Sequence, residues 1–328
     1  MSVRPVTPLY LSQADVVAAG LGLREMIDIV EDTFRLKGRG EVDCPPKTAL
    51  HPGPGSFFHA MPACVPAHRA VGVKWIGYYP GNVEARGVPD SAGVLILNSL
   101  ETGQPDCIMD GIWLSYTRTA AVTAVTAKYL ARPDARVLGL IGAGGLARTH
   151  LRALREVLPR LDRVLVFARR ESSRRGYCDE MAHDFPGTLV PVGSAEEAVA
   201  DADLVVSSTT KPEAPFLRAG WLKPGVLVTP LEGIAAWETA VLTAADKFLV
   251  DDARQALLMM RARRPEAEIP EPYAELGDVV VRRKAGRESA TERIVSINSG
   301  YAATDVTVGR AVYLRAVDQG LGTRLPLY

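Results

Sequence analysis

A glycine-rich turn at residues 142–147 is the segment of this chain that most clearly suggests chemistry. An apolar run precedes it and a helix-like segment, residues 146–158, follows, so the pattern predicts a strand, a phosphate-binding turn and a helix. Gly142 permits the tight turn, Gly144 lets a pyrophosphate approach the backbone, and Ala147 lets the helix pack on the strand. The helix N-terminus then offers N–H groups to the phosphates. The predicted nucleotide-binding residues of the turn are Gly142, Ala143, Gly144, Gly145, Leu146 and Ala147.

Two arginines, Arg169 and Arg170, follow the second apolar run at the spacing where such folds bind the adenosine ribose. A carboxylate there would accept a hydrogen bond from a ribose 2′-hydroxyl, whereas a guanidinium can bind a 2′-phosphate with two hydrogen bonds. We therefore predict that the cofactor is NADP(H) in preference to NAD(H). The alternative is that both arginines belong to an ordinary solvated loop.

Composition excludes several classes of protein. The chain has 328 residues, 47% of them hydrophobic and 23% charged, which suits a two-domain globular protein. Lys and Arg number 38, as do Asp and Glu, so no charge excess favours binding to nucleic acid or to a membrane. The four cysteines and five histidines show no metal-ligand spacing. With neither a signal-peptide pattern nor a membrane-length apolar run, we expect a cytoplasmic enzyme without a metal.

The first third of the chain predicts helices followed by an antiparallel sheet. Residues 23–36 carry apolar side chains at helical spacing, and residues 57–62, 71–76 and 93–97 are short apolar runs separated by Pro and Gly. The alanine-rich segment 115–131 then predicts a helix that ends before a proline. These elements indicate an α+β domain that is followed by the nucleotide-binding segment.

An alternation of strands and helices follows the glycine turn. Strands are predicted at 163–168, 188–191, 203–207, 226–229 and 247–250, and helices at 171–183 and 194–200. This order predicts an α/β fold with a doubly wound parallel sheet of the Rossmann type. We predict that the NAD(P)-binding domain spans residues 119–296 and that residues 297–328 return to the first domain, residues 1–118.

Short strings of residues along nearly the whole chain resemble one family. They are Pro46-Lys47-Thr48, Met61-Pro62-Ala63, Gly72-Val73-Lys74-Trp75, Arg118-Thr119-Ala120-Ala121, the turn 142–147, and Ser299-Gly300 with Asp305. In this order they resemble the ornithine cyclodeaminase and mu-crystallin family. Residues 74–82 and 97–103 are similar in part to the branch of dehydrogenases that act in 2,3-diaminopropionate synthesis.

The resemblance implies a homodimer in which residues 1–118 with 297–328 form the substrate-binding and dimerisation domain. It places the active site in a cleft that faces the Rossmann domain. It also implies chemistry at the C–N bond of an amino or imino acid, with hydride passing between the substrate α-carbon and the nicotinamide.

The same resemblance assigns substrate-binding roles to four residues. Lys74 corresponds to the family lysine that contacts the substrate carboxylate and can shuttle a proton, a role that desolvation would help by lowering its pKa. Arg118 corresponds to the family arginine that binds the carboxylate, which a planar guanidinium suits. Lys47 stands where the family usually has another arginine, and the alternative is an ordinary loop lysine. Met61 lies in a matching string and completes the set.

Cofactor contacts are expected outside the glycine turn as well. Thr119 would face the cofactor phosphates, while Ser208 and Thr209, after the fourth predicted strand of the domain, would line the ribose or nicotinamide. Ser299 corresponds to a family loop near the nicotinamide.

One departure from the family concerns the acid/base group. Cyclodeaminases carry an aspartate in a Gly-Asp-x-Pro-Gly-Lys string after the fifth strand, but here the string is Thr229-Pro-Leu-Glu-Gly-Ile and the position falls at or beside Glu232. A glutamate can perform the same proton transfer from one methylene further away, so Glu232 is a catalytic candidate beside Lys74 and Arg118. The alternative is a loop or cap carboxylate.

These residues predict an NAD(P)-dependent oxidoreductase that acts on the C–N bond of an amino acid derivative or its imine, as an amino acid dehydrogenase or a ketimine reductase. Two alternatives stay open. One is a redox-neutral cyclodeaminase, against which the missing Asp-x-Pro-Gly-Lys string argues. The other is a non-catalytic small-molecule binder like some mu-crystallins, against which Lys74 and Arg118 argue.

Overall fold

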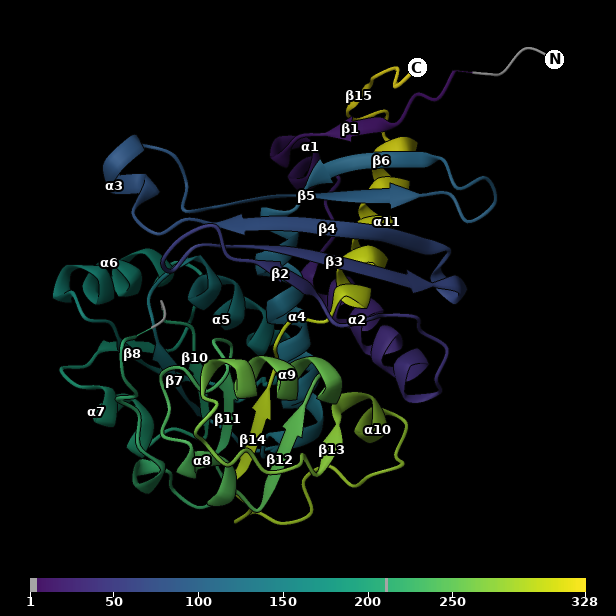
Figure 1. Cartoon of the computed structure of the whole chain (residues 1–328). Helices are drawn as coiled ribbons and strands as arrows, with labels where there is room; N and C mark the ends of the chain where they lie inside the picture. Colours follow the sequence, from purple (N-terminus) through teal and green to yellow (C-terminus); the bar gives the residue numbers. More distant parts are fainter. Residues whose placement is uncertain (1–4, 210–211) are drawn as a thin grey trace. The chain divides into compact units, whose positions relative to one another are not determined.

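The computed structural model describes residues 5–209 and 212–328, and the chain divides into two compact units. Unit 1 comprises Met1–Arg118 with Tyr301–Tyr328, and unit 2 comprises Thr119–Gly300. The N- and C-terminal segments thus belong to the same unit (Figure 1). The roles predicted for the two domains, substrate binding with dimerisation and cofactor binding, stay predictions.

Unit 1 is a mixed sheet with helices. Its described strands follow the order β15-β1-β6-β5-β4-β3-β2, and neighbours are antiparallel except for the parallel pair β1 and β6. The strands are β1 (Leu9–Leu11), β2 (Thr48–Leu50), β3 (Phe57–Val65), β4 (Ala70–Tyr78), β5 (Ser91–Asn98), β6 (Pro105–Asp110) and β15 (Thr323–Arg324). The helices are α1 (Gln13–Ala18), α2 (Leu23–Gly38), α3 (Asn82–Arg86) and α11 (Ala302–Asp318), with a 3₁₀ turn at Pro66–His68.

Helix α11 packs against the central strands β3, β4 and β5 (Figure 1). The approach is close at Gly309, where an added Cβ would lie 2.1 Å from the Leu95 side chain. The opposite side of α11 contacts α2, and a hydrogen bond of 2.9 Å joins Thr33 to Thr307. The side chains that α11 directs at the sheet therefore have fixed positions.

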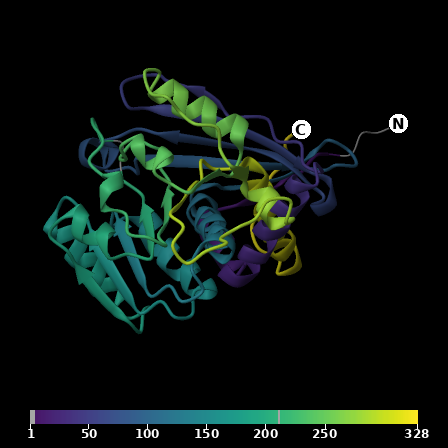
Figure 2. The same ribbon diagram turned by 90° about the horizontal axis from the view of Figure 1, so that it is seen from below.

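Unit 2 is built on a parallel sheet with the strand order β13-β12-β14-β11-β10-β7-β8-β9, whose strands lie side by side in Figures 1 and 2. They are β7 (Val137–Ile141), β8 (Arg163–Phe167), β9 (Thr188–Pro191), β10 (Leu204–Ser207), β11 (Leu227–Pro230), β12 (Lys247–Val250), β13 (Ala274–Glu275) and β14 (Ile294–Ile297). The helices are α5 (Gly145–Val157), α6 (Glu171–Met181), α7 (Ala195–Ala200), α8 (Ala240–Thr243), α9 (Ala253–Arg263) and α10 (Leu276–Val280), with a 3₁₀ turn at Ala219–Trp221. All recorded neighbours in this sheet are parallel.

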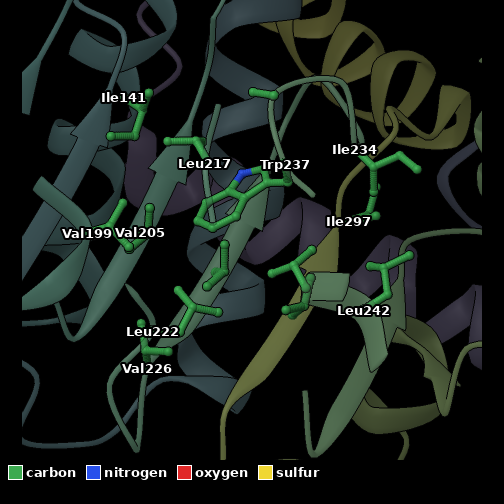
Figure 3. Close-up of a cluster of buried hydrophobic side chains, with 14 of the residues drawn as sticks. Ile141, Val199, Val205, Leu217, Leu222, Val226, Ile234, Trp237, Leu242 and Ile297 are labelled. Carbon is green, nitrogen blue, oxygen red and sulfur yellow. The ribbon is translucent and has the colours of Figure 1, made fainter. Parts of the chain in front are cut away.

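The two faces of this sheet bury separate apolar clusters. On β7, Leu138 and Leu140 belong to one cluster and Ile141 to the other, because successive strand residues point to opposite faces. The second cluster is centred on Trp237, which has no exposed surface (Figure 3). Gly139 permits close packing of α7, since an added Cβ would lie 2.1 Å from the carbonyl oxygen of Ala198. The fold class, a Rossmann-type parallel sheet with a second α+β unit, is confirmed.

Several predicted boundaries differ from the observed ones. Helix α4 (Ile112–Leu130) begins three residues before the predicted segment 115–131, because both carboxylate oxygens of Asp110 accept N–H groups of the first turn. The strands predicted within residues 57–97 are antiparallel as expected, and the sheet extends beyond them to the parallel pair of β1 and β6. Helices α9 and α10 lie where the sequence analysis made no prediction.

Candidate functional site

Three charged side chains of unit 1 meet at a buried cluster. One oxygen of Asp305, Oδ1, accepts hydrogen bonds from Lys74 Nζ at 2.7 Å and from Arg118 Nε at 2.8 Å. Lys74 Nζ also donates to the Ser115 hydroxyl at 3.2 Å. Lys74 and Asp305 are 1% and 0% exposed, and Arg118 is 5% exposed, so the charges are almost removed from water.

Different elements hold the members of this cluster. Lys74 lies on β4 opposite Met61 on β3 and Leu95 on β5, at a position whose neighbours are buried. Asp305 lies in the first turn of α11, the helix that covers this sheet. Ser115 and Arg118 are three residues apart on α4 and therefore lie on one side of that helix. The predicted pair Lys74 and Arg118 is thus brought together, with Met61 beside Lys74.

Burial lowers the pKa of Lys74 from its ordinary value to about 7. The positive charges of Arg118 and Lys47 lower it further, and the Asp305 carboxylate opposes them. A lysine in this state can hold or release a proton near neutral pH. This environment is the one that the predicted proton-shuttling role of Lys74 needs, although the role itself stays a prediction, as does substrate binding by Lys47 and Met61.

The cluster also contains buried polar atoms that lack hydrogen-bond partners among the described residues. They are Nη1 of Arg118 and Oδ2 of Asp305. A buried donor or acceptor without a partner costs about 1–3 kcal/mol, and more when the group is charged. A donor and an acceptor that a ligand could satisfy therefore lie in one cluster.

The glycine turn in unit 2 has the predicted geometry. Gly142 has φ +116°, and an added Cβ there would lie 2.8 Å from the carbonyl oxygen of Ser208. At Gly144 an added Cβ would meet no described atom within 4 Å, which leaves the backbone open to a ligand. Helix α5 begins at Gly145, and the N–H groups of a first helical turn have no intrahelical acceptor. The turn therefore fits a nucleotide pyrophosphate, and Ser208 lies beside it.

The segment after β8 carries the two predicted arginines on the surface. Arg169 and Arg170 are both exposed, and Arg170 is the N-cap of α6. Arg174, which the sequence analysis did not name, donates to the carbonyl oxygen of Ala168 at 3.1 Å and helps to fix this segment. The nearest acid, Glu171, is engaged by Arg175 at 2.7 Å.

The predicted cofactor residue Ser299 is held by a buried carboxylate that sequence analysis missed. Asp251, directly after β12, accepts hydrogen bonds from the Ser299 hydroxyl at 2.7 Å and from the Gly300 N–H at 2.8 Å. Gln255 on α9 donates to the Gly300 carbonyl oxygen at 2.6 Å. The position of Asp251 at the carboxyl end of a parallel strand could have identified it. Thr119, half-buried on α4, stays a predicted cofactor residue.

Glu232 lies in the segment after β11. Neither carboxyl oxygen is reachable by solvent, and neither has a hydrogen-bond partner of ordinary geometry within residues 5–209 and 212–328. Burial raises the pKa of Glu232 to about 7, while the nearby Ser207 hydroxyl and the positive charge of Arg263 lower it. Thr209, another predicted cofactor residue, likewise has a buried hydroxyl without a partner in that described part. The role of Glu232 as an acid/base group stays a prediction.

Two searches of the described chain gave negative results. Within residues 5–209 and 212–328 no three His, Cys, Asp or Glu side chains are grouped as metal ligands would be. No helix of those residues is long and apolar enough to cross a membrane.

Comparison with known proteins identifies the family. The profile of the ornithine cyclodeaminase/mu-crystallin family matches residues 8–320, so this chain belongs to that family. The nodulation efficiency protein NfeD of Rhizobium meliloti is 35% identical over 96% of this chain and 97% of its own length.

Two solved structures share the fold over nearly the whole chain. The Δ¹-pyrroline-2-carboxylate reductase of Thermococcus litoralis, in complex with NADH and L-proline, is 28% identical with a TM-score of 0.89 and covers 97% of this chain and 100% of its own. An archaeal alanine dehydrogenase dimer with bound NAD is 30% identical with a TM-score of 0.88 and covers 98% of this chain and 100% of its own. The predicted family is therefore confirmed.

Proposed function

We propose that this protein is an NAD(P)-dependent oxidoreductase that interconverts an α-amino acid and the corresponding imino acid. The predicted enzyme class, an oxidoreductase acting on CH–NH or C=N groups, is confirmed by the relatives, which include an alanine dehydrogenase and a pyrroline-2-carboxylate reductase that have nicotinamide cofactors bound. Neither relative fixes the substrate of this chain.

The observation that carries the proposal is the buried cluster of Lys74, Arg118 and Asp305. It leaves one guanidinium donor, Arg118 Nη1, and one carboxylate acceptor, Asp305 Oδ2, without partners in the described residues. An α-amino or α-imino acid carries a carboxylate that accepts hydrogen bonds and, one carbon away, a nitrogen that can donate them. The substrate class therefore satisfies both atoms with one small molecule.

The chain's own residues would perform binding and proton transfer. Arg118 binds the substrate carboxylate, and Asp305 accepts a hydrogen bond from the substrate nitrogen. Lys74, whose pKa is about 7, takes up the proton that leaves that nitrogen during oxidation and returns it during reduction. A nicotinamide nucleotide bound at the turn 142–147 supplies the acceptor or donor for the hydride of the substrate α-carbon.

An assay with purified protein tests the function. We expect reduction of NAD(P)⁺ with at least one member of a panel of L-amino acids that includes alanine and proline, and oxidation of NAD(P)H with the matching cyclic imine or with keto acid plus amine. Ammonia release without net cofactor turnover would instead show a cyclodeaminase. Cofactor binding with no turnover on the whole panel in either direction would contradict the proposal and favour a binder.

The cofactor that we propose is NADP(H) in preference to NAD(H). The exposed arginines Arg169 and Arg170 support it, because a guanidinium can bind a 2′-phosphate and the segment between Phe167 and Arg170 has no acid. The relatives described above contain NADH or NAD and leave this preference open.

The variant Arg169→Ala is expected to raise the KM for NADPH by about tenfold or more, because a charge-assisted hydrogen bond contributes roughly 1.5–3 kcal/mol. The KM for NADH should change by less than about twofold. Steady-state kinetics with both cofactors measures the effect, and Arg163→Ala, an exposed arginine at the other end of β8, is the matched control. Equal effects of Arg169→Ala on both cofactors would contradict the assignment.

We also propose that the protein acts in the cytoplasm as a homodimer, as the archaeal alanine dehydrogenase is a dimer.

A further inference from the structure

A network of buried hydrogen bonds in unit 2 joins helix α5 to the segment that follows β14. His150 on α5 lies 2.7 Å, through Nδ1, from the carbonyl oxygen of Leu146 and 3.1 Å, through Nε2, from the hydroxyl oxygen of Thr123 on α4. The amide nitrogen of the Asn298 side chain donates to the same hydroxyl at 3.4 Å. His150 and Thr123 have no exposed surface and Asn298 is 3% exposed, so these four residues, the His150 network, are shielded from water.

The direction of each hydrogen bond follows from the groups that make it. A carbonyl oxygen only accepts, so Nδ1 of His150 carries the ring proton. Burial lowers the pKa of His150 to about 4, and the ring is therefore neutral near neutral pH with Nε2 as an acceptor. The Thr123 hydroxyl must then donate to Nε2 and accept from Asn298. Reversing any one of these hydrogen bonds would break its neighbour.

A second threonine fixes the same amide group. Thr126 lies three residues after Thr123, so both side chains lie on one side of α4. Its hydroxyl oxygen is 2.9 Å from the Val122 carbonyl oxygen and 3.5 Å from Asn298 Oδ1, and its one proton serves the nearer acceptor. The Thr126 oxygen then accepts from the Asn298 amide nitrogen at 3.4 Å. The two N–H groups of this amide are thus directed at α4.

The ends of the His150 network lie at two parts of the predicted cofactor site. Leu146 belongs to the first turn of α5, and Asn298 directly follows β14 at the carboxyl end of the parallel sheet. A dinucleotide binds across these carboxyl ends, on both sides of the strand at which the strand order reverses. That strand is β7, and with the adenosine half beside β8, where Arg169 follows, the nicotinamide half lies on the side of β10, β11 and β14.

The two residues after Asn298 are held as well. The Asp251 carboxylate accepts hydrogen bonds from the Ser299 hydroxyl and the Gly300 N–H. Side chains from other elements therefore hold each residue of the segment 298–300. The His150 network links this segment to the helix whose first turn would bind the pyrophosphate.

We propose that His150 and Thr123 are positioning residues that hold the segment 298–300 in place relative to α5, so that the nicotinamide is oriented for hydride transfer when the pyrophosphate binds at the glycine turn. Because neither residue has exposed surface, neither can contact the cofactor, and both act through Asn298 and Leu146. The inference deepens the proposed function and rests on its nicotinamide cofactor. The continuous buried hydrogen bonds between the two parts of the site carry it.

The network itself is tested in the full-length protein without cofactor. With ¹⁵N-labelled histidine, one of the five histidine signals is assigned to His150 by its loss in His150→Gln. We expect the tautomer with the proton on Nδ1, and we expect the Nε2 resonance to shift in Thr123→Val because that nitrogen loses its donor. A proton on Nε2, or an Nε2 resonance that is the same in Thr123→Val, would overturn the inference.

The decisive variant for the positioning role is Thr123→Val, which keeps the branched shape of the side chain and removes the hydroxyl. Thr123→Ser retains the hydroxyl and should restore the native behaviour. The matched control is Thr229→Val, because Thr229 is a buried threonine of the same unit whose hydroxyl donates to the Val205 carbonyl oxygen at 3.2 Å.

Each protein is titrated with NADP⁺ and NAD⁺ and with the corresponding fragments that lack nicotinamide, 2′-phospho-ADP-ribose and ADP-ribose. We expect Thr123→Val to raise the Kd of the dinucleotide by about fivefold, the effect of roughly one hydrogen bond of ordinary strength. The Kd of the fragment should stay within about twofold of the native value. Because the nicotinamide is misplaced, kcat should fall by about tenfold. Thr123→Ser and Thr229→Val should resemble the native protein in all three quantities.

The comparison of dinucleotide with fragment separates positioning from a general loss of structure. An equal rise in both Kd values in Thr123→Val, or no change in Kd and kcat, would overturn the inference. A selective loss for the dinucleotide in a protein that oxidises no amino acid and reduces no imine would instead overturn the proposed function and leave the positioning role of Thr123 intact.

Discussion

Replacing Lys74 with alanine is expected to lower kcat by about 10³-fold, within the range of roughly 10²–10⁴ by which general acid/base groups accelerate reactions. The ammonium is buried, its pKa is about 7, and it lies 2.7 Å from Asp305, so no water-exposed group can replace it directly. The cofactor residues are predicted elsewhere in the chain, and the Kd for NADP(H) should change by less than about threefold. Single-turnover kinetics and fluorescence titration with NADPH measure the two quantities.

The matched control is Lys247→Ala. Lys247 is also a buried lysine that is paired with carboxylates, namely Glu288 and Glu292, but it lies on β12 and has no predicted contact with the substrate. Its loss should lower the free energy of unfolding and leave kcat within about threefold of the native value. Retention of native kcat in Lys74→Ala would contradict the assignment of Lys74, and an equal loss in both variants would show that the effect comes from stability.

The sequence identified Lys74 and Arg118 through their match to short strings of residues of the family, because such strings can be compared without knowledge of the fold. It also identified the glycine turn, because Gly142 needs a positive φ that other residues rarely adopt. These features are local. The alternation of strands and helices in residues 137–250 is equally local, so the parallel sheet was predicted with boundaries within a few residues of those observed.

The partners of these residues could not be predicted in the same way. Asp305 lies 231 positions from Lys74 in the sequence. We predicted that residues 297–328 return to the first domain, but nothing in the residues around Asp305 indicates that α11 packs on β4. Ser207 and Trp237 are 30 positions apart and meet only because β10 and the segment after β11 pack together. Contacts between residues far apart in the sequence depend on how the helices and strands are arranged in space. That arrangement depends on the burial of whole helices and strands more than on the few residues that come into contact.

Replacing Asp305 with alanine is expected to lower the free energy of unfolding by about 3–5 kcal/mol at pH 7, the usual cost of removing one partner from a buried ion pair. One oxygen of this carboxylate accepts hydrogen bonds from both Lys74 and Arg118, so its loss leaves both buried groups without their acceptor and their counter-charge. The matched control is Asp106→Ala, which removes the partner of Arg310 at 2.8 Å in a half-buried pair of the same unit. We expect that control to cost about 1 kcal/mol or less.

The dependence on pH separates this electrostatic cost from a packing cost. In the native protein the pKa of Lys74 is about 7, below its ordinary value of 10.5, so between these pH values the unfolded chain binds more protons than the folded one and stability rises with pH. Asp305 raises the pKa of Lys74, and its removal therefore extends this window below pH 7. Denaturant unfolding should show a larger cost of Asp305→Ala at pH 6 than at pH 9, because at pH 9 Lys74 is mostly neutral and only Arg118 lacks its anion. An equal cost at both pH values would mean that Asp305 contributes packing alone and that its charge does not control the proton on Lys74.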